Sequence, residues 1–319
     1  MSNTRDLSFD FIKGFLIFLV CWGHIIQFHI GEGHLQNETF MLIYSFHMPL
    51  FIMISGYFAC KSIKVGGVLL VIKTRTKRLL IPAVVWVSIF FVLARLRGET
   101  VDAHMLATTL HGAWFLFCLY ILYIVASFVW RTNHPYLISG AIALFLYLMF
   151  PYWPMGLRHL VYYLQLTRMW PVFVIGIFVC ERDILKRLGK TEKGFIIAIA
   201  SAIYLFYVTS GIFMHQQEWQ WYVFKDIAAL SATVVWLFTL RLLYVKVSNS
   251  IFATILCTLG NATLGVYMLN AQIIRILPPV SDNWFVMFAT AILVTALCYA
   301  ITLLLRKYKY TRIILLGEK

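Results

Sequence analysis

The sequence predicts an all-α integral membrane protein, a bundle of about ten transmembrane helices. Of its 319 residues, 61% are hydrophobic and only 13% are charged, and the mean hydropathy is +0.83. Soluble chains carry roughly 25% charged residues. The apolar residues form long continuous runs, not the alternating segments of about ten residues that build a membrane β-barrel. Only a helix satisfies its own backbone over such a run in hydrocarbon, so helices are favoured.

The spans follow from the apolar runs, because about 20 apolar residues cross the hydrocarbon core. We expect them near residues 9–30, 39–60, 79–95, 112–130, 136–153, 167–181, 194–214, 224–245, 251–274 and 284–305. The fifth and sixth are short and are interrupted by Pro151, Pro154 and Pro171. The connections are too short for a separate soluble domain, so we expect residues 1–319 to form one transmembrane domain.

The orientation follows from the basic residues of the connections. Lys and Arg gather within residues 61–78, 182–193 and 306–319, whereas the alternate connections hold few of them. Cytoplasmic loops carry this excess, so ten spans place both termini on the cytoplasmic side. The net charge of +14 lies in these clusters, and we therefore predict no nucleic-acid partner.

Two ionisable residues stand out in the first span, where charge is costly and often functional. Lys13 and His24 are eleven residues apart, which places them on one helix face about 16 Å apart along the axis. Lys13 could instead extend to the headgroups and pair with Asp10, three residues earlier. His24 could be a hydrogen-bonded interhelical histidine or a functional base.

Further candidates lie in or beside the other predicted spans, and we expect His47 and Asn270 at about the depth of His24. His47 precedes Pro49, which should kink the second span, and Ser55-Gly56 offers a small surface for close helix packing. The remaining candidates are a basic stretch leading into the third span (Arg75, Lys77, Arg78), Trp114 at the start of the fourth, Arg168 near an outer end, and Asn270 in the ninth. The basic stretch could be a membrane anchor or a seat for an anionic cosubstrate.

The six cysteines are scattered through or beside apolar runs without a C-x-x-C pair. Such residues are typical of small buried hydrophobes. We therefore predict neither a disulfide framework nor a metal site.

The ordered motifs resemble the acyltransferase-3 family of membrane acyltransferases along essentially the whole chain. They are the Lys13-x10-His24 spacing, Phe46-His47-Met48-Pro49-Leu50-Phe51 with Ser55-Gly56-Tyr57, Arg78-Leu-Leu-Ile-Pro82, Trp114-Phe115-Leu116, and Leu264-Gly265-Val266-Tyr267-Met268-Leu269-Asn270. The first member of the basic pair is often Arg in the family, and the last segment often ends in His. Lys13 keeps the charge but loses the bidentate fork, and Asn270 cannot act as a base.

The resemblance implies transfer of an acyl group, commonly acetyl from acetyl-CoA, to a hydroxyl of a cell-surface or lipid-linked glycan, in a bacterial inner membrane. His24 would be the base, Lys13 with Arg75, Lys77 and Arg78 would hold the donor, and His47, Trp114, Arg168, Tyr267 and Asn270 would orient the acceptor or His24. The partners would be membrane lipid, acyl-CoA and the glycan, and small-residue helix faces would permit a homodimer.

Two other interpretations of the sequence stay open. Intramembrane Lys and His would also suit a proton-coupled transporter or flippase of a saccharide or an anionic lipid-linked substrate. The absence of repeat symmetry and of an intramembrane acidic pair argues against it. A membrane acyltransferase of another fold is disfavoured, because such enzymes place the key histidine late in the chain.

Overall fold

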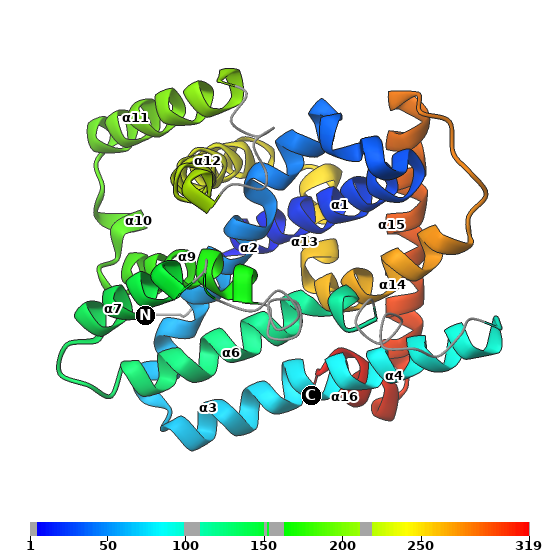
Figure 1. Cartoon of the computed structure of the whole chain (residues 1–319), viewed down its shortest axis with the longest axis horizontal. Helices are drawn as coiled ribbons and strands as arrows, with labels where there is room; N and C mark the ends of the chain where they lie inside the picture. Colours follow the sequence, from blue (N-terminus) through cyan, green and yellow to red (C-terminus); the bar gives the residue numbers. More distant parts are fainter. Residues whose placement is uncertain (1–4, 99–108, 150–151, 153–162, 211–218, 319) are drawn as a thin grey trace. The chain divides into compact units, whose positions relative to one another are not determined.

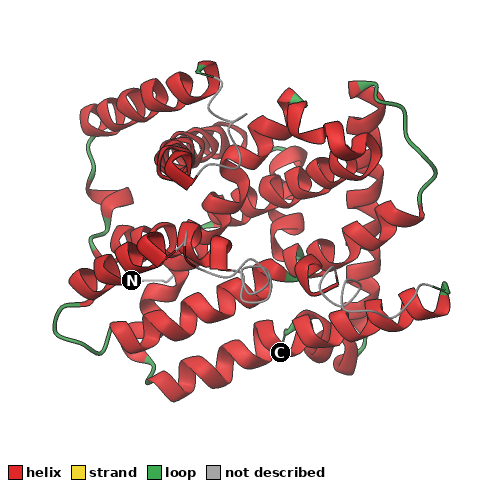
Figure 2. Ribbon diagram, in the orientation of Figure 1, coloured by secondary structure: helices red, strands yellow, loops and turns green. Residues whose placement is uncertain are grey.

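The computed structural model describes residues 5–98, 109–149, 152, 163–210 and 219–318, and every regular element within these ranges is helical (Figures 1 and 2). The helices are α1 (Leu7–Ile30), η1 (Gly31–Gln36), α2 (Glu38–Val65), α3 (Val68–Arg75), η2 (Thr76–Leu80), α4 (Ile81–Leu96), α6 (Trp114–Val129), α7 (Pro135–Met149), α9 (Tyr163–Glu181), α10 (Ile184–Arg187), α11 (Lys190–Thr209), α12 (Trp219–Val247), α13 (Ile251–Asn261), α14 (Thr263–Ile276), α15 (Trp284–Lys307) and α16 (Lys309–Leu316). They form two compact units, residues 1–51 with 188–303 and residues 52–187 with 304–319.

The all-helical membrane class is confirmed, although the count of ten spans is not. Six helical stretches in the described part are long and apolar enough to cross a membrane: Leu7–Gln36, Glu38–Val65, Val68–Leu96, Lys190–Thr209, Val223–Val247 and Trp284–Lys307. The predicted spans at 112–130, 136–153 and 167–181 correspond to α6, α7 and α9, of which α6 and α7 have only 16 and 15 residues. Ten spans and cytoplasmic termini stay predictions.

The predicted span at 251–274 is wrong as a single helix. The chain breaks at Ala262 into α13 and α14, which are bent by 85° to each other and would count as a seventh span only together. Gly260 and Asn261 precede the break, and both are poor helix formers. The Asn261 amide donates to the carbonyl of Cys257, four residues earlier. Residues 251–274 are apolar enough on average to resemble one span, and the Gly260-Asn261 pair was the local sign of the break that the prediction missed.

The first unit is organised around α1, which packs closely on α13. A methyl group at Gly14 would collide with the carbonyl oxygen of Leu256, and one at Gly260 with that of Asp10. The two backbones therefore touch, as small residues allow in membrane proteins. This crossing fixes α13, and through it α14, against the helix that carries Lys13 and His24.

The second unit has a similar glycine-mediated crossing between α2 and α9. A methyl group at Gly56 would collide with the carbonyl oxygen of Phe173, and one at Gly176 with that of Met53. The close packing predicted for Ser55-Gly56 is confirmed. Tyr123 of α6 adds a hydrogen bond of 3.0 Å to the carbonyl of Ser55.

The basic stretch forms an unusual connection in the second unit. Residues Thr76–Leu80 make a π-helical turn between α3 and α4. Pro82 has no N–H to bond the carbonyl of Arg78, four residues earlier. Gly317, in the left-handed conformation at the end of α16, lies so close to that carbonyl that a Cβ atom would come within 2.5 Å of it. The helix α16 also accepts a 2.9 Å hydrogen bond from the indole of Trp86 on α4, beside which it lies in Figure 1.

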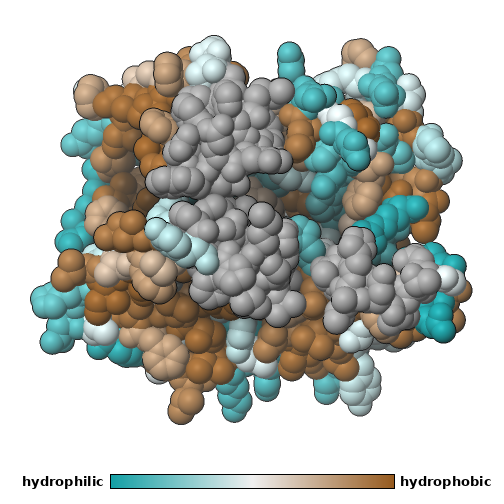
Figure 3. Space-filling view, in the orientation of Figure 1, coloured by the Kyte–Doolittle hydropathy of each residue, from teal (hydrophilic) through white to brown (hydrophobic). Residues whose placement is uncertain are grey.

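Apolar side chains cover much of the outer surface. Figure 3 shows hydrophobic residues exposed across the face in view, and exposed leucines such as Leu137 and Leu293 are 73% and 70% accessible. Such coverage exceeds the isolated apolar residues of a soluble protein surface. It fits a multi-pass membrane protein whose helices face lipid.

Candidate active site

His24 is held by Asn270, a contact between α1 and α14 in the first unit. Nδ1 of His24 lies 2.6 Å from Oδ1 of Asn270. Asn270 is fully buried. Sequence analysis named Asn270 among the residues that would orient His24 or the acceptor, and the structure brings its side chain to His24. The bend at Ala262 matters here, because it starts the new helix on which Asn270 lies.

The amide of Asn270 is oriented by its own helix. Its Nδ2 donates to the carbonyls of Val266 at 3.0 Å and Tyr267 at 2.6 Å, so Oδ1 is the atom that faces His24. An amide oxygen only accepts, and the hydrogen of His24 therefore sits on Nδ1. The neutral ring then keeps the lone pair of Nε2 for an incoming proton.

His47 lies near this pair through Tyr44, which the sequence did not single out. The ring of Tyr44 packs against Gly23, with Cε2 2.7 Å from where a Cβ atom would stand, and its centroid is 4.8 Å from that of His47. His47 is 2% exposed, and its Nδ1–H donates to the carbonyl of Ile43 at 2.7 Å. Tyr44 stands three residues before His47, on the same face of α2.

Arg275 is a second residue that sequence reasoning left without a role. Its guanidinium carbon lies 5.3 Å from the ring centroid of Phe28, and that ring is 6.3 Å from the imidazole of His24. It lies five residues after Asn270 on α14, and its contact with Phe28 is what brings this positive charge near His24.

Lys13 lies on α1 as predicted, since α1 is continuous from Leu7 to Ile30. Its ammonium is 2.7 Å from Oδ1 of Asp10, so the predicted pairing with Asp10 is confirmed as a contact. Asp10 is buried, and its other oxygen lies 2.7 Å from Nε of Arg5. Arg5 in turn donates to the side chain of Asn261. One buried carboxylate therefore joins two cations at this end of α1.

Of the other predicted residues, Tyr267 lies on α14 in the first unit and the rest lie in the second. Arg75 is fixed there, with its guanidinium carbon 3.8 Å from the ring centroid of Tyr123 and a 3.1 Å hydrogen bond to Ser62. Lys77 and Arg78 are exposed on the π-helical turn. Trp114 begins α6, as predicted, and is half-buried like Arg168 on α9.

Comparison with known proteins gives the family. The model of an acyltransferase domain, that of the acyltransferase-3 family, matches residues 6–306. The chain is 34% identical over 141 residues to "Nodulation protein NolL" of Mesorhizobium japonicum, covering 41% of this chain and 38% of that protein. It is 41% identical over 91 residues to "Nodulation protein NolL" of Sinorhizobium fredii, covering 28% of this chain and 25% of that protein.

The chain thus spans about two fifths and a quarter of the lengths of these two relatives. No solved structure matches it. The family model nonetheless covers nearly the whole chain, and it includes both Lys13 and His24 as well as the late segment that ends in Asn270. The chain therefore belongs to the acyltransferase-3 family of membrane acyltransferases.

Proposed function

We propose that this protein transfers an acyl group, most simply acetyl, from acyl-CoA to a hydroxyl of a cell-surface or lipid-linked glycan in the inner membrane of a bacterium. The hydrogen bond between His24 and Asn270 carries the proposal. It gives a membrane helix an imidazole of defined tautomer, which is what a general base for acyl transfer requires. Family membership supplies the class of reaction.

His24 acts as the base in this scheme. Nε2 takes the proton of the acceptor hydroxyl as its oxygen attacks the thioester carbonyl, and a tetrahedral oxyanion forms. The intermediate then collapses, the carbon–sulfur bond breaks, and the CoA thiolate takes the proton back from the imidazolium. Asn270 holds the hydrogen on Nδ1 throughout, the role that a third group plays for other catalytic histidines.

The oxyanion needs a donor or a positive charge. Asn270 is disfavoured for that task, because its Nδ2 already donates to Val266 and Tyr267. Arg275 is the better candidate in the described residues, since its guanidinium and the imidazole of His24 both lie against the ring of Phe28. Tyr267 is buried on α14 and stays a second candidate.

The acyl donor is bound through its phosphates by basic residues, in this proposal Lys13, Arg75, Lys77 and Arg78. Exposed Lys77 and Arg78 suit contact with phosphate, while Arg75 is held in place by Tyr123. Lys13 contributes from its pair with Asp10, and it has one ion-pair partner to exchange before it can bind an anion. His47, Trp114 and Arg168 are proposed to orient the acceptor.

Binding of acetyl-CoA to the purified, detergent-solubilised protein tests the proposal, with wild type beside Lys13→Ala and His24→Ala. We expect binding by the wild type and by His24→Ala, and weaker binding by Lys13→Ala. A folded wild-type protein that does not bind acetyl-CoA would contradict the proposed donor. Saccharide flux into vesicles would then be the next measurement, because it tests the transporter.

A further inference from the structure

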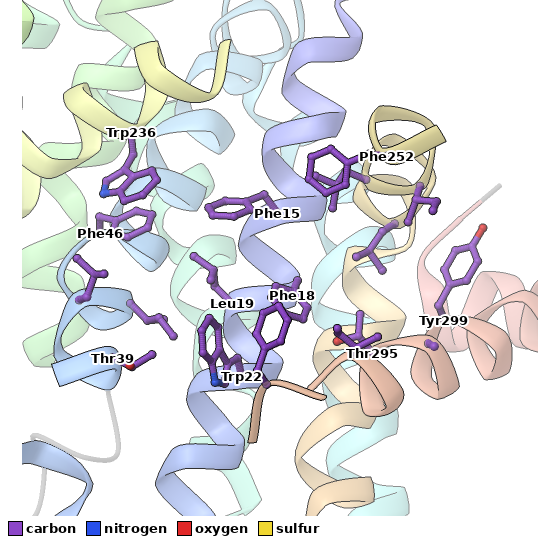
Figure 4. Close-up of a pocket in the computed structure, with 18 of the residues that line it drawn as sticks. Phe15, Phe18, Leu19, Trp22, Thr39, Phe46, Trp236, Phe252, Thr295 and Tyr299 are labelled. Atoms are coloured by element: carbon purple, nitrogen blue, oxygen red, sulfur yellow. The ribbon is translucent and has the colours of Figure 1, made fainter. Parts of the chain in front are cut away.

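The first unit has a cavity of about 720 Å³ beside α1, and the cavity is open on one side (Figure 4). Phe15, Phe18 and Trp22 of α1 line it, with Phe46 of α2, Trp236 of α12 and Phe288 of α15. Residues of α13 complete the wall. The volume lies in the range of sites that bind a drug-sized ligand, about 300–1,000 Å³.

The lining is chemically unlike a sugar or CoA site. Aliphatic and aromatic side chains dominate it, and the polar groups are three threonines, the hydroxyl of Tyr299 and the indoles. A buried water needs two to four polar partners, so this cavity is poorly suited to water. Side chains that line an unfilled apolar volume also lack packing partners on that side. The lining therefore calls for an apolar occupant.

The cavity is bordered by side chains that are exposed in the protein alone. Leu42, Phe252, Ile255, Trp284 and Ile292 all line it, and each is more than a third exposed. In a membrane-spanning chain, exposed apolar side chains of this kind face hydrocarbon. An apolar molecule of the bilayer can therefore enter sideways, without crossing a polar layer.

The cavity is separate from the proposed reacting groups. His24 follows Phe15 by nine residues, a rotation of about 180° around the helix. Lys13 shares the face of His24, so α1 stands between the cavity and both residues. An acceptor bound at His24 would not need this space, and an occupant of the cavity would not be presented to His24.

The helices α1 and α15 contact each other at one border of the cavity and are separated by its open volume beyond that border. Rings of α1 and α15 meet at its border, with centroids of Trp22 and Phe288 4.9 Å apart and those of Trp22 and Trp284 5.3 Å apart. Beyond these rings the facing side chains line the open volume in Figure 4. An inserted chain would supply the missing contacts between α15, α1 and α2.

We propose that this cavity binds the hydrocarbon chain of a bilayer phospholipid, which packs as a structural part of the first unit. The inference does not rest on the acyltransferase reaction. The apolar lining excludes a sugar or CoA, and the lateral opening admits a hydrocarbon chain from the bilayer. The helix α1 separates the cavity from an acceptor bound at His24.

The test compares two neighbouring exposed residues of α15. Ile292 lines the cavity and Leu293 does not, and both are exposed, at 47% and 70%. Ile292→Trp should obstruct the cavity, whereas Leu293→Trp adds the same ring outside it. Each protein is purified in mild detergent from bacterial membranes, and the lipid retained per chain is identified by native mass spectrometry. Thermal unfolding is then followed with and without added phospholipid.

We expect wild type and Leu293→Trp to retain phospholipid and to be stabilised by its addition. Ile292→Trp should retain several-fold less phospholipid, and added phospholipid should not raise its melting temperature. If Ile292→Trp aggregates, Ala296→Phe, which also lines the cavity, takes its place beside Ala300→Phe. Equal retention by both variants would overturn the proposal. So would retention of an isoprenoid or glycolipid in place of phospholipid, or a lipid-free dimer that Ile292→Trp dissociates.

Discussion

His24 and Asn270 are separated by 246 residues, yet their side chains meet at 2.6 Å. Each was recognisable in the sequence as a polar group in an apolar helix. What the sequence could not give was the direction of the amide, which depends on the carbonyls of Val266 and Tyr267. That direction decides which ring nitrogen of His24 is free to act as a base.

Replacing Asn270 by leucine tests this positioning. Leucine has a similar volume but accepts no hydrogen bond, so the Nδ1–H tautomer loses its support. A hydrogen bond to a reacting group of about 1.5–3 kcal/mol corresponds to a roughly ten- to hundredfold loss of kcat. The KM for acyl-CoA should stay near wild type, and steady-state kinetics measures both.

Asn270→Asp is the matched control, because the carboxylate keeps an acceptor for Nδ1–H. It should retain more activity than Asn270→Leu. Full activity in Asn270→Leu, or a loss confined to KM, would show that Asn270 does not orient the base.

Asp6 gives a pH-dependent prediction at the start of α1. Burial acts to raise the pKa of this carboxyl, but the hydrogen bonds from Ser8 and the charge and hydrogen bond of Arg241 outweigh it and leave the pKa below its usual value. The stabilisation is therefore present above the unfolded pKa of about 3.9 and is lost as the pH falls through the lower folded pKa.

Asp6→Asn should lower the melting temperature slightly at neutral pH, since the pair with Arg241 is partly exposed and screened. The same variant should show a smaller drop on acidification than wild type, followed by thermal scans across the acid range. Asp183→Asn, at a more exposed carboxylate, is the control. Parallel pH profiles of wild type and Asp6→Asn would contradict the assignment.

Two glycine-mediated crossings hold helices together, α1 with α13 in the first unit and α2 with α9 in the second. The sequence indicated Ser55-Gly56 as a packing surface, but its partner Gly176 and the Gly14–Gly260 pair emerged only from the structure. Hydrophobic patterns show that a helix is buried without showing which backbone it touches. The break at Ala262 was missed for another reason, because the average hydropathy of residues 251–274 hid the Gly260-Asn261 pair.

Gly14→Ala should destabilise the first unit, because its Cβ would collide with the backbone carbonyl of Leu256. Overpacking of this kind typically costs about 1–3 kcal/mol. Gly194→Ala on α11 is the control, since nothing lies within 4 Å of an added Cβ atom there. Thermal unfolding in detergent should show a lower melting temperature than wild type for Gly14→Ala only. Equal melting temperatures of wild type and Gly14→Ala would refute the tight crossing.

For the whole molecule, composition predicted the all-α membrane class, and the order of the motifs predicted the family. The number of spans could not be predicted as well. The helices α6 and α7 are shorter than a full crossing, and α13 and α14, predicted as one span, are bent by 85° to each other. The contacts of Tyr44 with Gly23 and His47, and of Arg275 with Phe28, also required the fold, since each residue by itself looks like ordinary helix packing.

The distribution of basic residues predicts that both termini are cytoplasmic. Green fluorescent protein fused to the C-terminus should therefore fluoresce, and alkaline phosphatase fused there should be inactive, because each reporter works on one side only. The same pair of reporters after Gly98, which lies in the predicted outer connection between the spans at 79–95 and 112–130, should give the reverse. Active phosphatase at the C-terminus would contradict the orientation.

We expect this membrane protein to transfer an acyl group with His24 as the base. The most direct test is transfer of label from radioactive acetyl-CoA to the glycan fraction of membranes that contain wild type or His24→Ala at matched levels. A general base contributes about 10²–10⁴ in rate, so label should accumulate with wild type and nearly vanish with His24→Ala. Equal labelling by the two proteins would contradict the role of His24, and no labelling by folded wild type would contradict acetyl transfer itself.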